Sequence, residues 1–124
     1  MKPKFLILDF IILILIVFIQ SCDRSDSQIC ACGVENPQEN LEWLKNILQR
    51  RSVSCTEVYL VRYKSEDYIG VFDCPKGADF GGGYFSCDGT YICGYQGFTG
   101  IWDCSEEFTE AVNDQTLIYK QDNP

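Results

Sequence analysis

The chain has 124 residues and carries a formal net charge of −8. Its length allows one domain with a modest core. The acidic balance argues against nucleic-acid binding, which requires clustered Lys and Arg side chains to displace counterions. The sequence contains no His, which excludes Ser-His-Asp and Cys-His catalysis and any zinc site with a His ligand. We therefore expect a protein that is not an enzyme and that binds no cofactor.

The first residues have the organisation of an export signal. Two lysines precede an apolar run over residues 5–19, and Cys22 follows in the sequence Ile-Gln-Ser-Cys. The run is shorter than the about 20 apolar residues that a transmembrane helix needs, and it contains Asp9, which is costly inside a bilayer. This pattern predicts a lipoprotein signal peptide over residues 1–21.

Processing of this signal would leave Cys22 as the amino-terminal residue, carrying fatty-acyl chains such as palmitate. Several acyl chains acting together hold a protein stably on a membrane. We therefore expect lipidation of Cys22 and a location in the cell envelope, anchored to a membrane and facing the periplasm or the exterior. The alternative is ordinary signal-peptidase cleavage nearby, which would leave Cys22 as a structural thiol.

The rest of the chain divides into a polar tether over residues 22–29 and a single domain over residues 30–124. Cysteines in a small exported domain usually form a disulfide framework, in which each bridge stabilises the fold by about 2–4 kcal/mol. Because seven cysteines remain besides Cys22, we expect three bridges at most, with one cysteine left over and a pairing that the spacing does not determine. These are Cys30, Cys32, Cys55, Cys74, Cys87, Cys93 and Cys104.

A helix is predicted over residues 37–50. Asn36 is expected as its N-cap, Pro37 occupies the first helical position, and Glu39 completes an approximate capping box. Apolar residues then recur at helical spacing and form one stripe. They are Leu41, Leu44 and Leu48, widened by Trp43 and Ile47.

The remaining chain has the pattern of β-strands. Residues 58–63 and 68–74 are rich in β-branched and aromatic side chains and are expected to form a hairpin. A second hairpin is expected from residues 84–87 and 90–95, because Asp88-Gly89 between them is a strong turn signal.

The predicted loop and the last elements follow from shorter signals. Residues 75–83 hold a proline and several glycines and are expected to be a loop. Ser105 could cap a short helix that ends near Val112, and residues 116–120 are expected to be a last strand. The fold class is therefore α+β, with one amino-terminal amphipathic helix packed on a small, mostly antiparallel sheet and stabilised by disulfides.

Two longer stretches and one short stretch resemble a family of small lipoproteins from Gram-negative bacteria. Asn-Pro-Gln-Glu-Asn-Leu-Glu-Trp-Leu at residues 36–44 is similar to that family's helix opening, although Gln38 and Glu42 stand where the family often has Leu and Pro. Cys-Asp-Gly-Thr-Tyr-Ile-Cys at residues 87–93 and Leu-Ile-Tyr at residues 117–119 also fit. The family has no assigned activity, so the resemblance implies a fold and an envelope location but no chemistry.

Aromatic residues are abundant, and the alternation of side chains in strands must place some of them on the surface. Rings in or beside glycine-rich loops can stack on a sugar or anchor a protein partner. The candidate binding surface consists of Tyr95, Phe98 and Trp102. We expect a non-catalytic binding or structural protein whose ligand is a glycan or another protein.

Other functions stay open. Cys30 and Cys32 would suit thiol-disulfide exchange or a soft metal such as Cu(I), although redox domains usually place Cys-x-x-Cys at a helix start. The size and the disulfides would also suit an exported inhibitor of hydrolases. Paired carboxylates for glycoside hydrolysis are a further alternative, which the abundance of Asp and Glu does not resolve. The EF-hand and phosphate-loop patterns are not matched.

Overall fold

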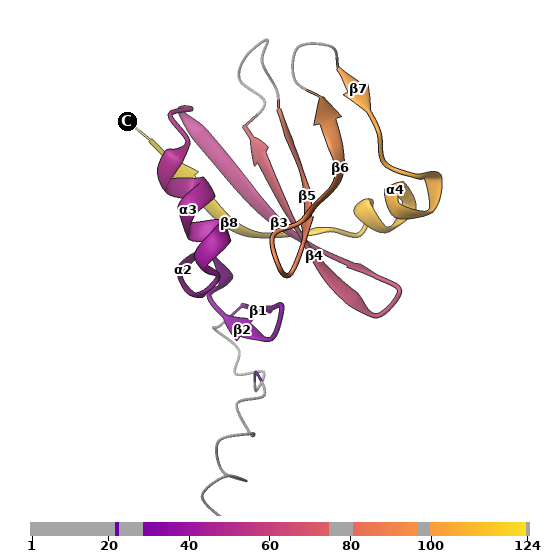
Figure 1. Ribbon diagram of the computed structural model, residues 1–124, viewed down its shortest axis with the longest axis horizontal. Coiled ribbons are helices and arrows are strands. Elements are labelled where there is room, and N and C mark those ends of the chain that lie inside the picture. Colours follow the sequence, from indigo (N-terminus) through magenta and orange to yellow (C-terminus); the bar gives the residue numbers. More distant parts are fainter. Residues whose placement is uncertain (1–21, 23–28, 75–80, 97–99, 124) are drawn as a thin grey trace, which may run out of the picture.

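Six strands form one antiparallel sheet, and two short strands form a separate hairpin (Figure 1). The computed structural model describes residues 22, 29–74, 81–96 and 100–123, so the predicted signal peptide and most of the tether lie outside the described residues. The sheet order is β7-β6-β5-β4-β3-β8. The strands are β1 (Cys30–Ala31), β2 (Val34–Glu35), β3 (Cys55–Tyr63), β4 (Glu66–Asp73), β5 (Gly82–Ser86), β6 (Tyr91–Gln96), β7 (Ile101–Trp102) and β8 (Thr116–Asp122). The helices are α2 (Pro37–Asn40), α3 (Glu42–Arg50) and α4 (Glu106–Val112). The predicted α+β class is confirmed.

Both predicted hairpins are present, as the pairs β3–β4 and β5–β6. In the turn between β5 and β6, the Asp88 carboxylate accepts hydrogen bonds from the Ser86 hydroxyl and, at 3.0 Å, from the backbone N–H of Thr90. These hydrogen bonds, that from Ser86 first, lower the pKa of Asp88. Gly89 has φ = 88°, a conformation that costs other residues energy, so the Asp-Gly pair fixes the turn.

The helix predicted over residues 37–50 is interrupted. Leu41 has extended backbone angles (φ −95°, ψ 108°) and separates α2 from α3. The prediction of a side-chain cap by Asn36 is wrong, because this residue is left-handed (φ 46°) and its side chain makes no cap hydrogen bond. Its backbone carbonyl instead accepts the N–H groups of Glu39 and Asn40, at 2.9 and 3.1 Å. Asn tolerates this conformation better than most residues. Asn36 therefore begins the helix through its backbone carbonyl and not through its side chain.

One further expectation is corrected, and another is confirmed. Gly82 and Gly83 begin β5, so the loop expected over residues 75–83 ends earlier than predicted. The short helix suggested after Ser105 is present as α4, and it packs on the face of the sheet opposite α3 (Figure 1). The Ser105 hydroxyl accepts the N–H of Phe108 at 3.2 Å and caps this helix as predicted.

Helix α3 covers one face of the sheet. Its buried side chains Leu44 and Leu48 belong to a single apolar cluster with residues of β3, β4 and β8. Burying a leucine contributes about 1.5–3 kcal/mol, so this stripe holds the helix in place. The sheet residues of the cluster are Val58, Ile69, Val71 and Ile118.

Trp43 joins α3 to the turn between β5 and β6. Its indole Nε1 donates a hydrogen bond to the Cys87 carbonyl at 2.9 Å. Its ring lies against the turn, where a Cβ on Gly89 would be 2.8 Å from Trp43 Cγ. The two longer stretches that carry the family resemblance therefore form one packing unit.

Helix α4 covers part of the opposite face. Its buried residue Phe108 has its ring centroid 5.3 Å from each of the rings of Tyr63, Tyr68 and Tyr84, in edge-to-face arrangements. Tyr63 and Tyr68 lie next to the β3–β4 turn. The helix therefore covers the half of this face that is nearer that turn.

The disulfides use all eight cysteines. They join Cys22 to Cys30, Cys32 to Cys87, Cys55 to Cys74, and Cys93 to Cys104. Three bridges thus form within the set of seven, and Cys30 is the one left over, which pairs with Cys22. A lipid thioether on Cys22 would need the same Sγ atom, so the expected lipidation and the Cys22–Cys30 bridge exclude each other.

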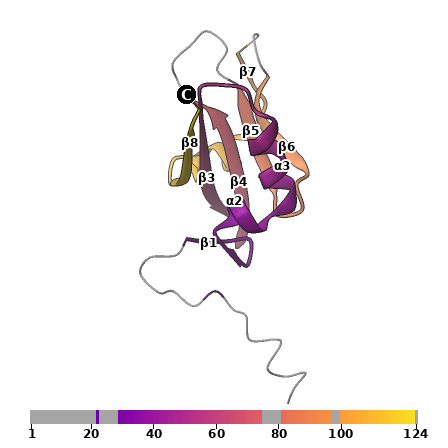
Figure 2. The same cartoon turned by 90° about the vertical axis from the view of Figure 1, so that its left-hand side faces the viewer.

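The β1–β2 hairpin and the carboxyl-terminal part of β8 lie at opposite ends of the sheet (Figure 2). The hairpin is joined to Cys22 through Cys30. The Cys32–Cys87 bridge and a hydrogen bond of 2.9 Å from the Cys32 N–H to Asp67 hold the hairpin at its end of the sheet. None of the helices in the described part of the chain has the length and apolar composition to span a bilayer.

Candidate functional site

A row of five residues crosses the α4 face of the sheet, near the strand ends farthest from the β1–β2 hairpin. Adjacent members are cross-strand partners, and such partners point to the same face of an antiparallel sheet. Because Gly82 has no side chain, the row has a gap in its middle. In sheet order the row is Glu57, Phe72, Gly82, Tyr95 and Trp102.

Glycines leave room for the rings over the sheet. A Cβ on Gly82 would lie 2.3 Å from the Val71 carbonyl oxygen and 2.5 Å from Phe72 Cδ1. A Cβ on Gly70 would lie 2.7 Å from Tyr84 Cε1. These distances are far below van der Waals contact, so Phe72 and Tyr84 can occupy their positions only because the strand residues beneath them are glycines.

Helix α4 and the residues after it supply a second wall. The Trp102 Nε1 donates to the Thr109 hydroxyl at 2.9 Å, and this hydroxyl donates to the Ser105 carbonyl at 2.8 Å. The Tyr84 hydroxyl donates to the Gln115 side-chain oxygen at 2.8 Å. Both aromatic side chains are thereby fixed to the helix side of the site.

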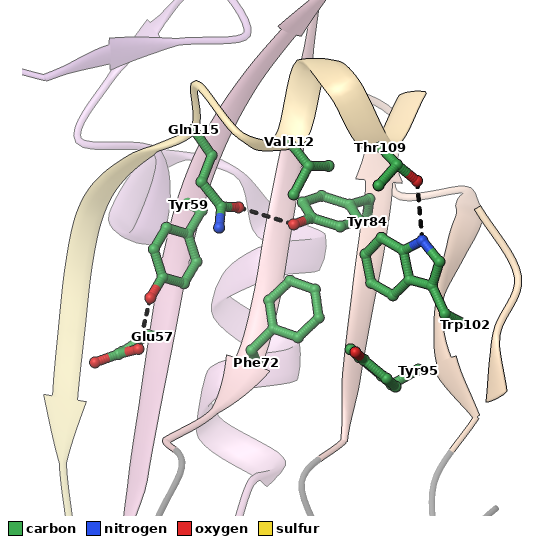
Figure 3. A pocket seen from close by; sticks show the side chains of 9 residues that line it. All are labelled: Glu57, Tyr59, Phe72, Tyr84, Tyr95, Trp102, Thr109, Val112 and Gln115. Carbon is green, nitrogen blue, oxygen red and sulfur yellow. Dashed lines mark hydrogen bonds between the residues drawn. The ribbon is translucent and has the colours of Figure 1, made fainter. Parts of the chain in front are cut away.

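These side chains line a groove of about 550 Å³ (Figure 3), within the range of about 300–1,000 Å³ that is usual for small-molecule sites. Neighbouring rings are steeply inclined: 68° for Tyr59–Phe72, 63° for Phe72–Tyr84, 89° for Tyr84–Trp102 and 55° for Tyr95–Trp102. The groove therefore presents π faces in several directions. The lining residues are Glu57, Tyr59, Phe72, Tyr84, Tyr95, Trp102, Thr109, Val112 and Gln115.

One carboxylate lies at the β3 side of the groove. Glu57 Oε2 accepts a hydrogen bond from the Tyr59 hydroxyl at 2.6 Å, and Glu57 Oε1 is 3.8 Å from Nζ of Lys120 on β8. Burial, followed by the hydrogen bond and the charge of Glu57, raises the pKa of Tyr59 to about 12, so this hydroxyl keeps its proton at neutral pH. The Lys120 side chain is 47% exposed and that of Glu57 is 18% exposed, so the lysine approaches from the solvent side.

The groove contains two of the three residues predicted as a binding surface. Tyr95 and Trp102 lie together, with ring centroids 4.9 Å apart, whereas Phe98 lies outside the described residues. Sequence reasoning missed Glu57, which lies one residue before the strand expected over residues 58–63, and Phe72, which lies in the strand expected over residues 68–74. Their signal was the alternation along β3 and β4, which places both on the face opposite α3.

Cys30 and Cys32, which would suit redox or metal chemistry, do not line this groove. Cys32 is bonded to Cys87 and Cys30 to Cys22, so the pair Cys30 and Cys32 does not form one dithiol unit. Within residues 22, 29–74, 81–96 and 100–123, no group of three or more His, Cys, Asp or Glu side chains could hold a metal ion.

Comparisons of the chain with protein-family models, with curated proteins and with solved structures gave no match. The resemblance to small Gram-negative lipoproteins stays a prediction from the motifs at residues 36–44 and 87–93. The candidate function therefore rests on the groove and on the sequence signals for export.

Proposed function

We propose that the protein is an exported, lipid-anchored protein of the cell envelope that binds a small ligand in its aromatic groove and catalyses no reaction. The groove is the observation that carries this proposal. Five aromatic side chains from five different strands converge there, held by the strand register and by hydrogen bonds to α4. Concave sites with aromatic walls and a few polar groups are the usual form of small-ligand sites.

The absence of catalysis is supported by the chemistry of the lining. Glycoside hydrolysis needs two carboxyl groups that flank the scissile bond. The described lining residues include one carboxylate, Glu57, which already accepts a hydrogen bond from Tyr59. The sequence has no His to act as a general base.

The envelope location is supported by the three disulfides that do not involve Cys22, because disulfides persist in oxidising compartments. The predicted leader and Cys22 supply the export and anchor signals. The chain that follows Cys22 enters the domain at Cys30 of β1, at the β1–β2 end of the sheet, and the groove row lies near the opposite strand ends. A membrane anchor at Cys22 would therefore leave the groove facing away from the membrane.

The test uses the neutral fluorophore N-phenyl-1-naphthylamine as a probe of the mature protein. We expect saturable binding, with Trp102→Ala weakening it at least about tenfold, since stacking on an aromatic side chain contributes substantially. Ile101→Ala is the matched control, because Ile101 is the neighbouring residue, 58% exposed and on the opposite face of β7. Circular dichroism checks the folding of both variants. Binding that is non-saturable, or that Trp102→Ala leaves unchanged, would refute the groove as the site.

A further inference from the structure

The charge of the groove favours a cation. Of the described residues that line it, Glu57 is charged and none is Lys or Arg. The whole chain carries a net charge of −8, which attracts cations and repels anions at long range. Lys120 reaches Glu57 only at 3.8 Å and from a half-exposed position, so a better-placed cation can displace it.

The rings favour a cation with an apolar surface. Cations bind over the faces of Trp, Tyr and Phe rings, and the effect is larger when the cation loses its water. Tyr59 and Phe72 supply such rings beside the carboxylate of Glu57, and Tyr95 and Trp102 lie on the other side of Phe72 (Figure 3). Tyr59 and Tyr84 are inclined steeply to Phe72, at 68° and 63°, so the rings enclose the space from more than one side.

The hydrogen bonds of the groove argue against a sugar. Three of the four aromatic donors in the described lining are engaged within the protein: Tyr59 with Glu57, Tyr84 with Gln115, and Trp102 with Thr109. A sugar would compete with these internal hydrogen bonds, and each buried hydroxyl left without a partner would cost about 1–3 kcal/mol. A quaternary ammonium ion has no N–H groups and needs no hydrogen-bond partner.

We propose that the groove binds a small quaternary ammonium ion at its β3 side, with its methyl groups against Tyr59 and Phe72 and its charge toward Glu57. This rests on the proposed function, because it assigns a ligand class to the same groove. Binding displaces the Lys120 ammonium from Glu57 and leaves the hydrogen bond from Tyr59 in place.

The experiment compares choline with its uncharged isostere 3,3-dimethylbutan-1-ol by isothermal titration calorimetry on the mature protein. We expect choline to bind at least about tenfold more tightly, since the two ligands share a shape and differ in charge. Glu57→Gln, which keeps an oxygen acceptor for Tyr59, should weaken choline binding about tenfold and leave the isostere unchanged. Lys120→Met should strengthen choline binding. Equal affinities for both ligands, or choline binding that is insensitive to both substitutions, would overturn the assignment.

The naphthylamine probe separates this proposal from the broader one. If the probe binds and Trp102→Ala abolishes its binding, but choline does not bind, the groove remains the binding site and the ammonium assignment is wrong. If neither the probe nor choline binds, the proposed function itself fails. Circular dichroism of Glu57→Gln and Lys120→Met shows whether each variant is folded, and either folded variant suffices for the test.

Discussion

At the scale of single residues, Thr56 is the buried polar side chain among the described residues. It is 0% exposed, and its hydroxyl has no hydrogen-bond partner there. A buried hydroxyl without a partner costs about 1–3 kcal/mol, and an apolar group of the same shape removes that cost. We expect Thr56→Val to increase the free energy of unfolding by about 1 kcal/mol, measured by urea denaturation with an unchanged slope.

Thr109→Val is the matched control for this substitution. The Thr109 hydroxyl accepts from Trp102 Nε1 and donates to the Ser105 carbonyl, so its loss should destabilise the protein by about 1 kcal/mol. If Thr56→Val were as destabilising as Thr109→Val, the Thr56 hydroxyl would have a partner and the premise would be wrong.

The raised pKa of Tyr59 leads to a second prediction, on how stability depends on pH. Its pKa of about 12 in the folded protein exceeds the value of about 10 for an unfolded chain. Its contribution to stability is therefore complete below pH 10 and decreases as the pH rises from 10 to 12, because the folded state then binds the proton that the unfolded state has lost. Tyr59→Phe should remove this part of the alkaline loss of stability.

The pKa of Tyr59 can be measured as the difference in tyrosinate absorbance between the wild-type protein and Tyr59→Phe during alkaline titration. Glu57→Gln should lower this pKa, because it removes the negative charge that disfavours the phenolate, but burial should keep the pKa above its ordinary value. Titration of Tyr59 near pH 10 in the wild-type protein would contradict the hydrogen bond to Glu57.

At the scale of elements, local signals predicted the hairpins and the cap of α4. The Asp88-Gly89 turn and the Ser105 cap each depend on residues within a few positions, so the sequence contains their cause. The break at Leu41 and the left-handed Asn36 were not predicted. The Asn36 N–H donates to the Ile29 carbonyl at 3.0 Å, and Leu41 packs against the apolar cluster under α3, which are contacts that local sequence signals do not specify.

The groove could be predicted only in part for the same reason. Tyr95 and Trp102 were identified because both lie near glycines along the sequence. Glu57 joins them through the register of five strands, a non-local property that alternation alone does not fix. The sequence predicts Gly82 in a loop, because glycines cluster there. In the structure Gly82 belongs to β5, and its lack of a side chain leaves the space between Phe72 and Tyr95.

Two disulfides should differ in their effect on the groove. The Cys93–Cys104 bridge joins residues two positions from Tyr95 and Trp102, and the Cys32–Cys87 bridge lies at the other end of the sheet. Loops of 11 and 55 residues predict losses of stability of about 3 and about 4 kcal/mol on removal of each bridge. We expect the Cys93→Ala/Cys104→Ala variant to lose probe binding and the Cys32→Ala/Cys87→Ala variant to keep it.

The measurements are denaturant unfolding and titration with N-phenyl-1-naphthylamine at a temperature where both double variants are folded. The bridge with the smaller predicted effect on stability should have the larger effect on binding. If binding followed stability and not position, the groove would depend on the whole fold and not on the local attachment of β7 to β6.

At the scale of the whole molecule, the sheet separates two apolar clusters with different tasks. The cluster under α3 contains aliphatic side chains from β3, β4 and β8, and it includes Ala31 of β1, so it extends toward the tether end. The cluster under α4 is mostly aromatic and continues into the groove through Phe72 and Tyr84. One face of the sheet therefore packs against α3 and connects to β1, and the other face carries the groove that we propose as the binding site.

The state of Cys30 reports whether the protein is anchored. If Cys22 carries lipid on its Sγ atom, it cannot bond to Cys30, and the other six cysteines are paired among themselves. We therefore expect the membrane-bound protein to have one thiol that is alkylated without reduction, at Cys30, and an acylated Cys22 at its amino terminus. Mass spectrometry of the alkylated protein measures both.

Two variants separate the anchor from the bridge. The Cys30→Ser protein should still be anchored, whereas the Cys22→Ser protein should leave the membrane fraction and keep the Cys30 thiol. A protein with no reactive thiol and an intact Cys22–Cys30 bridge would be exported without lipid, and the groove would then act free of the membrane.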